Sequence, residues 1–183
     1  MSNSNKIQRV SIVLQYLCYA FIALATFFVL GSLFNLLVSP EVLQEYIADA
    51  AIPTLIRISE ASASRAIPAT LIFFTPVALI MYAYWRLSQL FGVYKQGIYF
   101  SDANADHLFA FALISFIGQL LGFPIIGIAD YVVTIGVADI PYGMPFFIDG
   151  DEIPNLILSG AFLTISWIMR EGIRIANENA EFV

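Results

Sequence analysis

Four long stretches of the sequence carry no charged side chain, and no other feature constrains the fold as strongly. They cover residues 10–40, 66–85, 108–129 and 153–169. A helix needs about 20 apolar residues to cross the roughly 30 Å hydrocarbon core of a membrane, and about 17 to 25 are tolerated. These stretches therefore predict membrane-spanning helices.

The composition supports a membrane protein over a soluble one. Hydrophobic residues make up 60% of the chain and charged residues 12%, with a mean hydropathy of +0.82. A soluble domain is nearer half apolar and a quarter charged, and disordered chains show the opposite bias. Buried helices of a soluble bundle would each need a polar stripe, which these stretches lack. Disorder and an ordinary soluble enzyme are thus excluded.

We predict an all-α fold, an integral membrane four-helix bundle that forms a single domain over residues 1–183. Its expected parts are spans at approximately 10–38, 66–86, 107–129 and 153–170, structured outer loops at 41–64 and 130–152, and an inner connector at 87–106. A cleaved signal peptide is the alternative for the first span. Because a signal core has only about 7 to 15 apolar residues, we expect an uncleaved anchor.

The basic residues predict the orientation, because cytoplasmic loops carry an excess of Lys and Arg. Six lie on one expected side, namely Lys6, Arg9, Arg86, Lys95, Arg170 and Arg174, and two on the other, Arg57 and Arg65. Nine of the carboxylates fall on the side with fewer bases. Both termini are therefore expected in the cytoplasm, below an acidic outer face.

Several residues predict local helix boundaries. Gly97 is placed to end the second long helix, and Ser101 is a good N-cap for the third. Short amphipathic helices are expected in the first outer loop, interrupted at Pro53. Pro76 and Pro124 are expected to kink their helices because proline removes a backbone hydrogen bond. The fourth helix is expected to extend beyond residue 170.

The sequence offers little material for catalysis. Cys18 and His107 are the only cysteine and histidine, so we expect no catalytic residue, cofactor or metal site. The net charge of −6 argues against direct nucleic-acid binding. An enzyme that uses the outer carboxylates Asp149, Asp151 and Glu152 with a divalent cation is a weaker hypothesis, since clustered acids are usually only solvated.

The polar residues within the spans leave alternatives open. Gln15, Asn35 and Gln119 could line a path through the membrane, but such amides more often form hydrogen bonds between helices. Gly118 and Gly122 form a small-xxx-small face suited to helix packing or to contact with a partner. An ion-coupled transporter is disfavoured because no ionisable residue lies at mid-membrane depth.

Two motifs on the inner side carry a family resemblance. They are Gly97-Ile98-Tyr99-Phe100-Ser101-Asp102-Ala103-Asn104 and, in the tail, Glu171-Gly172-Ile173-Arg174 followed by Glu178-Asn179 and Phe182-Val183. With the span count, they make the chain similar to the bacterial four-span membrane proteins grouped as domain of unknown function 2975. The resemblance implies a multi-pass protein of the bacterial inner membrane without established enzymatic activity. Some members are associated with small helix-turn-helix regulators, and no catalytic residue is implied.

The favoured function is that of a non-catalytic membrane protein that acts through protein–protein contacts. It would be an accessory or scaffold subunit of a membrane complex, or the membrane partner of a cytoplasmic regulator. The expected partners are the lipid bilayer and a protein in the membrane or at its cytoplasmic face. The candidate inner-face contacts are Arg86, Lys95, Arg170 and Arg174. The alternative is a small transporter or channel subunit with the polar path described above.

Overall fold

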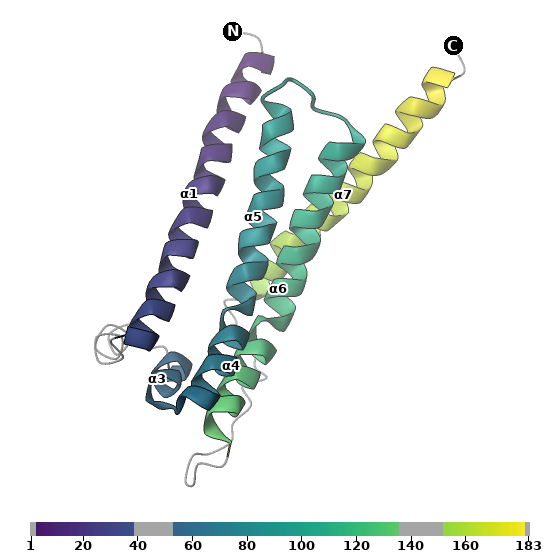
Figure 1. The fold of residues 1–183 in the computed structure, drawn as a ribbon. Helices are drawn as coiled ribbons and strands as arrows, with labels where there is room; N and C mark the ends of the chain where they lie inside the picture. The colour runs from purple at the N-terminus through teal and green to yellow at the C-terminus, as the bar shows by residue number, and fades with distance from the viewer. Residues whose placement is uncertain (1–2, 39–52, 136–151, 182–183) are drawn as a thin grey trace. The chain divides into compact units, whose positions relative to one another are not determined.

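A computed structural model describes residues 3–38, 53–135 and 152–181 (Figure 1). These residues form α-helices and turns and include no strand. Four helical segments are long and apolar enough to cross a membrane: Ser4–Leu36, Ala63–Tyr94, Asp102–Thr134 and Ile153–Ala176. The predicted all-α membrane fold is confirmed.

The helices extend beyond the predicted spans. They are α1 (Asn3–Val38), α3 (Pro53–Glu60), α4 (Ala63–Phe73), α5 (Thr75–Tyr94), α6 (Asp102–Thr134) and α7 (Glu152–Glu181). Residues 130–134, expected at the start of an outer loop, form the last turn of α6. The rest of that loop up to residue 151, and residues 41–52 of the first outer loop, lie outside the described residues.

The break between α4 and α5 has a local cause in Pro76. This residue has no N–H to donate to the preceding turn, so the backbone ladder is interrupted there. Phe74 still donates its N–H to the carbonyl of Thr70 at 3.1 Å, and Ala78 donates to the carbonyl of Phe74 at 3.0 Å. Pro124, in contrast, lies inside α6 without ending it.

Contacts divide the chain into two compact units, and α1, α5 and α6 each contribute to both. One unit consists of Met1–Ala23, Leu79–Gln119 and Gly150–Val183, and the other of Leu24–Ala78 and Leu120–Asp149. The first is called the inner unit here, because it contains both termini, which are expected to face the cytoplasm. The second is called the outer unit.

In the outer unit, α3 is a short amphipathic helix, as expected for the first outer loop. Leu55 and Ile58 lie three residues apart on one face and are both buried. Leu55 packs with Phe74, while Ile58 packs with Ala66, Ala69 and Val133. The burial of this apolar face holds α3 against α4 and the end of α6.

In the inner unit, an unbroken series of aromatic contacts links all the long helices. The ring centroids of Phe21 and Tyr84 are 4.3 Å apart, those of Tyr84 and Phe111 6.2 Å, and those of Phe111 and Phe162 5.9 Å. These separations lie within or close to the range for favourable tilted and edge-to-face pairs. The four rings therefore join α1, α5, α6 and α7.

Candidate functional site at the inner end of α7

The α5–α6 connector is held in shape by the residues of its motif. Gly97 has a φ of 83°, which glycine adopts without the steric cost of a side chain. The hydroxyl of Ser101 accepts a hydrogen bond from the backbone N–H of Asn104 at 3.3 Å, so the expected N-cap is present. The buried side chain of Asn104 donates to the carbonyl of Ile98 at 2.9 Å.

A tyrosine between the capping residues ties the connector to the start of α1. The hydroxyls of Tyr99 and Ser4 lie 2.9 Å apart, and Tyr99 also donates to the backbone carbonyl of Ser4 at 3.2 Å. The Tyr99 ring lies 6.2 Å from that of Tyr94, at the end of α5. These contacts fix the connector to α1 and α5, while the side chain that follows Tyr99 projects from the turn.

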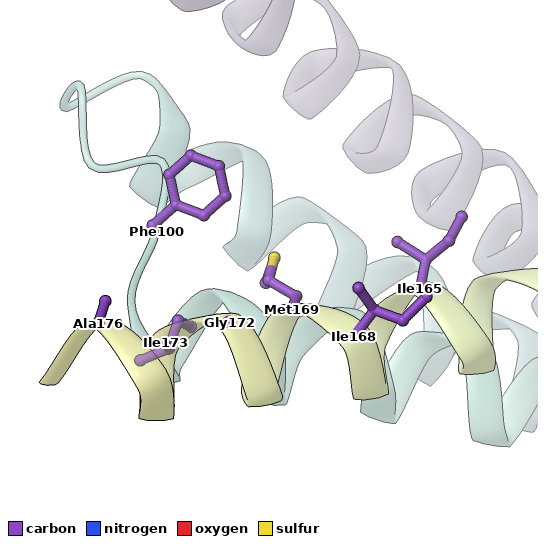
Figure 2. A pocket seen from close by; sticks show the side chains of 7 residues that line it. All are labelled: Phe100, Ile165, Ile168, Met169, Gly172, Ile173 and Ala176. Carbon is purple, nitrogen blue, oxygen red and sulfur yellow. The ribbon is translucent and has the colours of Figure 1, made fainter. Parts of the chain in front are cut away.

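That side chain is Phe100, which is 81% exposed and faces an apolar groove on α7. Figure 2 shows the Phe100 ring above the helix, with the other lining side chains along α7. The groove has a volume of about 660 Å³, and its α7 residues are Ile165, Ile168, Met169, Gly172, Ile173 and Ala176. None of the lining residues is charged.

The last turns of α7 carry exposed charges that form local pairs. Arg174 donates to Glu171 at 2.5 Å and 3.0 Å and to Glu178 at 2.6 Å. Charged side chains are costly inside the hydrocarbon, so this part of α7 belongs at or beyond the membrane boundary. The groove runs along α7 on both sides of Arg170.

Two of the bases expected to make inner-face contacts are bound to α6. Arg170 donates to the carboxylate of Asp106 at 2.6 Å and lies 4.5 Å from the centroid of the Phe109 ring. Arg86 donates to the backbone carbonyl of Asp106 at 3.2 Å. An exposed pair of this kind contributes only about 0–1 kcal/mol. The Arg170 contact links α7 to the start of α6, and the Arg86 contact links α5 to it.

Lys95, which directly follows α5, donates a hydrogen bond to the side chain of Gln15, and the amide of Gln15 also binds α5 itself. Gln15 is only 8% exposed and donates to the backbone carbonyl of Ser88 at 3.1 Å. Its carbonyl oxygen accepts a hydrogen bond from the Lys95 ammonium at 3.0 Å. Gly92 makes room for this amide, because a Cβ there would lie 2.9 Å from the Gln15 nitrogen. Gln15 therefore joins two helices and leaves no free group for a path.

Two further polar residues of the spans, Gln119 and Asn35, were candidates for the same path. Gln119 lines a separate cavity in the inner unit, and Asn35 is a half-buried residue of the outer unit. A Cβ on Gly118 or Gly122 would have no described atom within 4 Å. The two glycines therefore make no close helix contact within the described part of the chain.

The residues considered for metal chemistry lie mostly outside the described part of the chain. Within residues 3–38, 53–135 and 152–181, no three His, Cys, Asp or Glu side chains lie together in a group that could hold a metal. Asp149 and Asp151 lie outside these ranges, and Glu152 is the first residue of α7. His107 is half-buried on the first turns of α6.

The whole chain, residues 1–183, matches the family described as protein of unknown function (DUF2975). The chain belongs to this family. Comparisons with curated proteins and with solved structures give no match. Membership confirms the resemblance noted on the connector and tail motifs, but it brings no assigned function, so the function must be argued from the chain's own residues.

The groove itself was not predicted from the sequence. Phe100 stands in the connector motif, which signals the turn, but the α7 residues opposite it are indistinguishable from lipid-facing side chains in a linear pattern. The connector motif could have pointed to Phe100, because the residues around it have structural roles while Phe100 has none within the turn.

Proposed function

We propose that this protein is a non-catalytic, multi-pass membrane protein that binds a cytoplasmic protein through the groove between Phe100 and α7. In this role it serves as an accessory or scaffold subunit of a membrane complex, or as the membrane partner of a cytoplasmic regulator. One observation carries the proposal. An apolar groove with an 81% exposed phenylalanine lies beside the charged last turns of α7.

The energetics favour an occupant with an apolar side. Burying one exposed phenylalanine stabilises a complex by about 1.5–3 kcal/mol. The nearby charges of Glu171 and Arg174 provide a polar rim of the kind that surrounds protein interfaces. We therefore assign the groove to an apolar side chain, or a short helix face, presented by a protein at the cytoplasmic surface.

The orientation belongs to the same proposal. Six bases on the side of the two termini, against two on the other, support a cytoplasmic location for both ends. The groove then faces the cytoplasm, where a soluble partner reaches it. The proposed location is the bacterial inner membrane.

The alternative of a transporter or channel subunit has weaker support. Its proposed path needed Gln15, and the amide of that residue is engaged by Ser88 and Lys95. Gln119, another residue proposed for the path, lines a cavity. That cavity is considered separately below.

Site-specific photo-crosslinking tests the proposed function. A photoreactive benzoylphenylalanine replaces Phe100 in one variant and Phe27, a 78% exposed residue of α1, in a matched control. After illumination of native membranes, we expect a discrete protein adduct from position 100 and none from position 27. Mass spectrometry identifies the adduct, and the purified partner is then titrated against the purified chain.

A second variant links the adduct to the groove. A Cβ at Gly172 would have no described atom within 4 Å, so Gly172→Leu places an added side chain at the groove. We expect the adduct yield and the affinity of the purified partner to fall severalfold. Lipid adducts alone, the same adduct from both positions, or full binding by Gly172→Leu would each contradict the proposal.

A further inference from the structure

A second cavity lies among the four long helices of the inner unit. It has a volume of about 280 Å³ and is lined by residues from α1, α5, α6 and α7. All of these residues lie within the candidate membrane spans. The cavity therefore lies in the part of the inner unit that is expected to be surrounded by lipid, and it shares no lining residue with the groove at the end of α7.

The polar groups of this cavity come from two facing pairs. Ser115 and Gln119 are four residues apart on α6, and Asn155 and Ser159 are four residues apart on α7, so each pair shares a helix face. These are uncharged donors and acceptors, and no lining residue carries a charge. Gln119 was recognised as a candidate from the sequence, whereas the approach of Asn155 and Ser159 on α7 to the same cavity was not.

Most of these polar groups are not used within the chain. Among the residues that the structure describes, the side chains of Ser115, Gln119 and Asn155 form no hydrogen bond, whereas Ser159 donates to the carbonyl of Leu156 at 3.0 Å. Polar groups without a partner are costly in an apolar environment. A hydrogen-bonding occupant removes that cost.

The walls of the cavity restrict what the occupant can be. Phe21, Tyr84, Phe111 and Phe162 line it, and they form the continuous aromatic series that joins the helices. Aromatic faces and edges pack favourably against a planar ring. An apolar cavity of about 150 Å³ is enough to hold benzene. The space here is larger and is suited to a substituted ring, and the lack of a charged partner excludes an ionic ligand.

We propose that this cavity binds an uncharged, membrane-soluble ring compound that carries carbonyl or hydroxyl groups. The ring lies against the phenylalanine and tyrosine walls. The amides of Gln119 and Asn155 donate to the ligand's oxygens, and the hydroxyl of Ser115 donates or accepts. The inference does not depend on the proposed protein partner, because no groove residue takes part.

Binding to the chain in lipid nanodiscs tests this inference. The probe is menadione, a naphthoquinone with two ring carbonyls, and the matched ligand is naphthalene, which has the same fused ring and no oxygen. Saturable quenching of the protein's intrinsic fluorescence reports menadione, and displacement of bound menadione reports naphthalene, with empty nanodiscs correcting for partition into lipid. We expect menadione to bind about tenfold more tightly than naphthalene, because naphthalene cannot form the one or two hydrogen bonds that the carbonyls of menadione accept.

Variants locate the binding. Gln119→Leu removes an amide that lines the cavity, and Gln96→Leu removes one that is exposed at the end of α5 and donates to the carbonyl of Gly92. We expect Gln119→Leu to weaken menadione binding about tenfold and Gln96→Leu to leave it unchanged. Equal binding of menadione and naphthalene by the unaltered chain overturns the inference, as does unchanged binding by Gln119→Leu. The first of these outcomes requires no variant to fold.

Discussion

At the scale of single residues, Gln15 and Gln119 show that the same side chain has different roles in similar apolar surroundings. Gln15 is closed off by Ser88 and Lys95, whereas Gln119 faces a cavity with no partner in the described chain. The difference is produced by their neighbours. Gly92 leaves room for the Gln15 amide against α5, whereas Gln119 lines a cavity together with aromatic rings.

This account predicts an unusual effect of Gly92→Ala. Alanine is a better helix former than glycine by about 1 kcal/mol, which alone would stabilise α5. However, the new methyl group would lie 2.9 Å from the Gln15 nitrogen and displace the amide from its bonds. Hydrogen bonds between membrane helices average about 0.6 kcal/mol and reach about 1.7, so losing both bonds costs about 1.2 to 3.4 kcal/mol. After the gain in helix propensity, a net destabilisation of about 0.2 to 2.4 kcal/mol remains.

Unfolding titrations in mixed micelles of dodecyl maltoside and dodecyl sulfate measure this free energy. The control is the same substitution in a Gln15→Ala background, where the methyl group meets no amide. There Gly92→Ala should be neutral or stabilising. A loss of stability of the same size in both backgrounds would show that Gln15 is not the residue that requires glycine.

At the scale of helices, α3 illustrates how a short segment is held without a long apolar face. Its buried residues Leu55 and Ile58 provide the packing, and Arg57 adds a directed contact. The Arg57 guanidinium donates to the carboxylate of Asp130 at 2.6 Å, which links α3 to the last turns of α6. The Asp130 side chain is 16% exposed and that of Arg57 39% exposed.

We predict that Arg57→Ala loosens α3. The carboxylate of Asp130 would lose its described ion-pair partner, and solvent screening at the half-exposed arginine limits the cost to about 1 kcal/mol. Hydrogen–deuterium exchange of residues 53–60 should rise several-fold. Arg65→Ala removes the same charge from the neighbouring helix and should leave this exchange unchanged, because Arg65 forms no ion pair among the described residues.

The double variant Arg57→Ala with Asp130→Asn gives a second check on this contact. A neutral amide is less costly to leave without a cation, so protection of α3 should be partly restored. If the double variant exchanges faster than Arg57→Ala alone, the ion pair is not what holds α3 in place.

At the scale of the whole molecule, the distribution of charge determines how the chain should sit in the membrane. Six bases belong to the inner unit, which contains both termini, and two belong to the outer unit. Both the proposed groove and the tail of α7 fall on the basic side. The orientation is therefore the property on which access of a cytoplasmic partner depends.

Cysteine labelling tests the orientation. Cys18 is the only cysteine and is buried, so Cys18→Ser provides the background. Single cysteines are then introduced at two exposed glutamates, as Glu60→Cys at the end of α3 and as Glu178→Cys near the end of α7. In intact spheroplasts, a membrane-impermeant maleimide should label position 60 and not position 178. Permeabilised spheroplasts should label at both, and the reverse pattern in intact spheroplasts would place both termini outside.

Features of the fold that depend on residues close together in the sequence could be predicted, and features that depend on distant segments could not. Gly97 and Ser101 were recognised as helix boundaries because their roles depend on backbone conformation within a few residues. The spans were recognised because hydropathy sums along one segment. Phe100 and the α7 side chains of the groove were not recognised, because they come from segments more than 60 residues apart.

The sequence by itself determined that this chain is an all-helical membrane protein of its family, where the long helices run, and how the inner connector turns. These properties follow from local hydropathy, local capping and short motifs. Only the tertiary structure decided that Gln15 forms a hydrogen bond between α1 and α5, that Gln119 and Asn155 line the same cavity, and that Phe100 faces a groove. Such pairings depend on the rotation and tilt of each helix, which are set by side-chain packing between distant segments and leave no pattern along the chain.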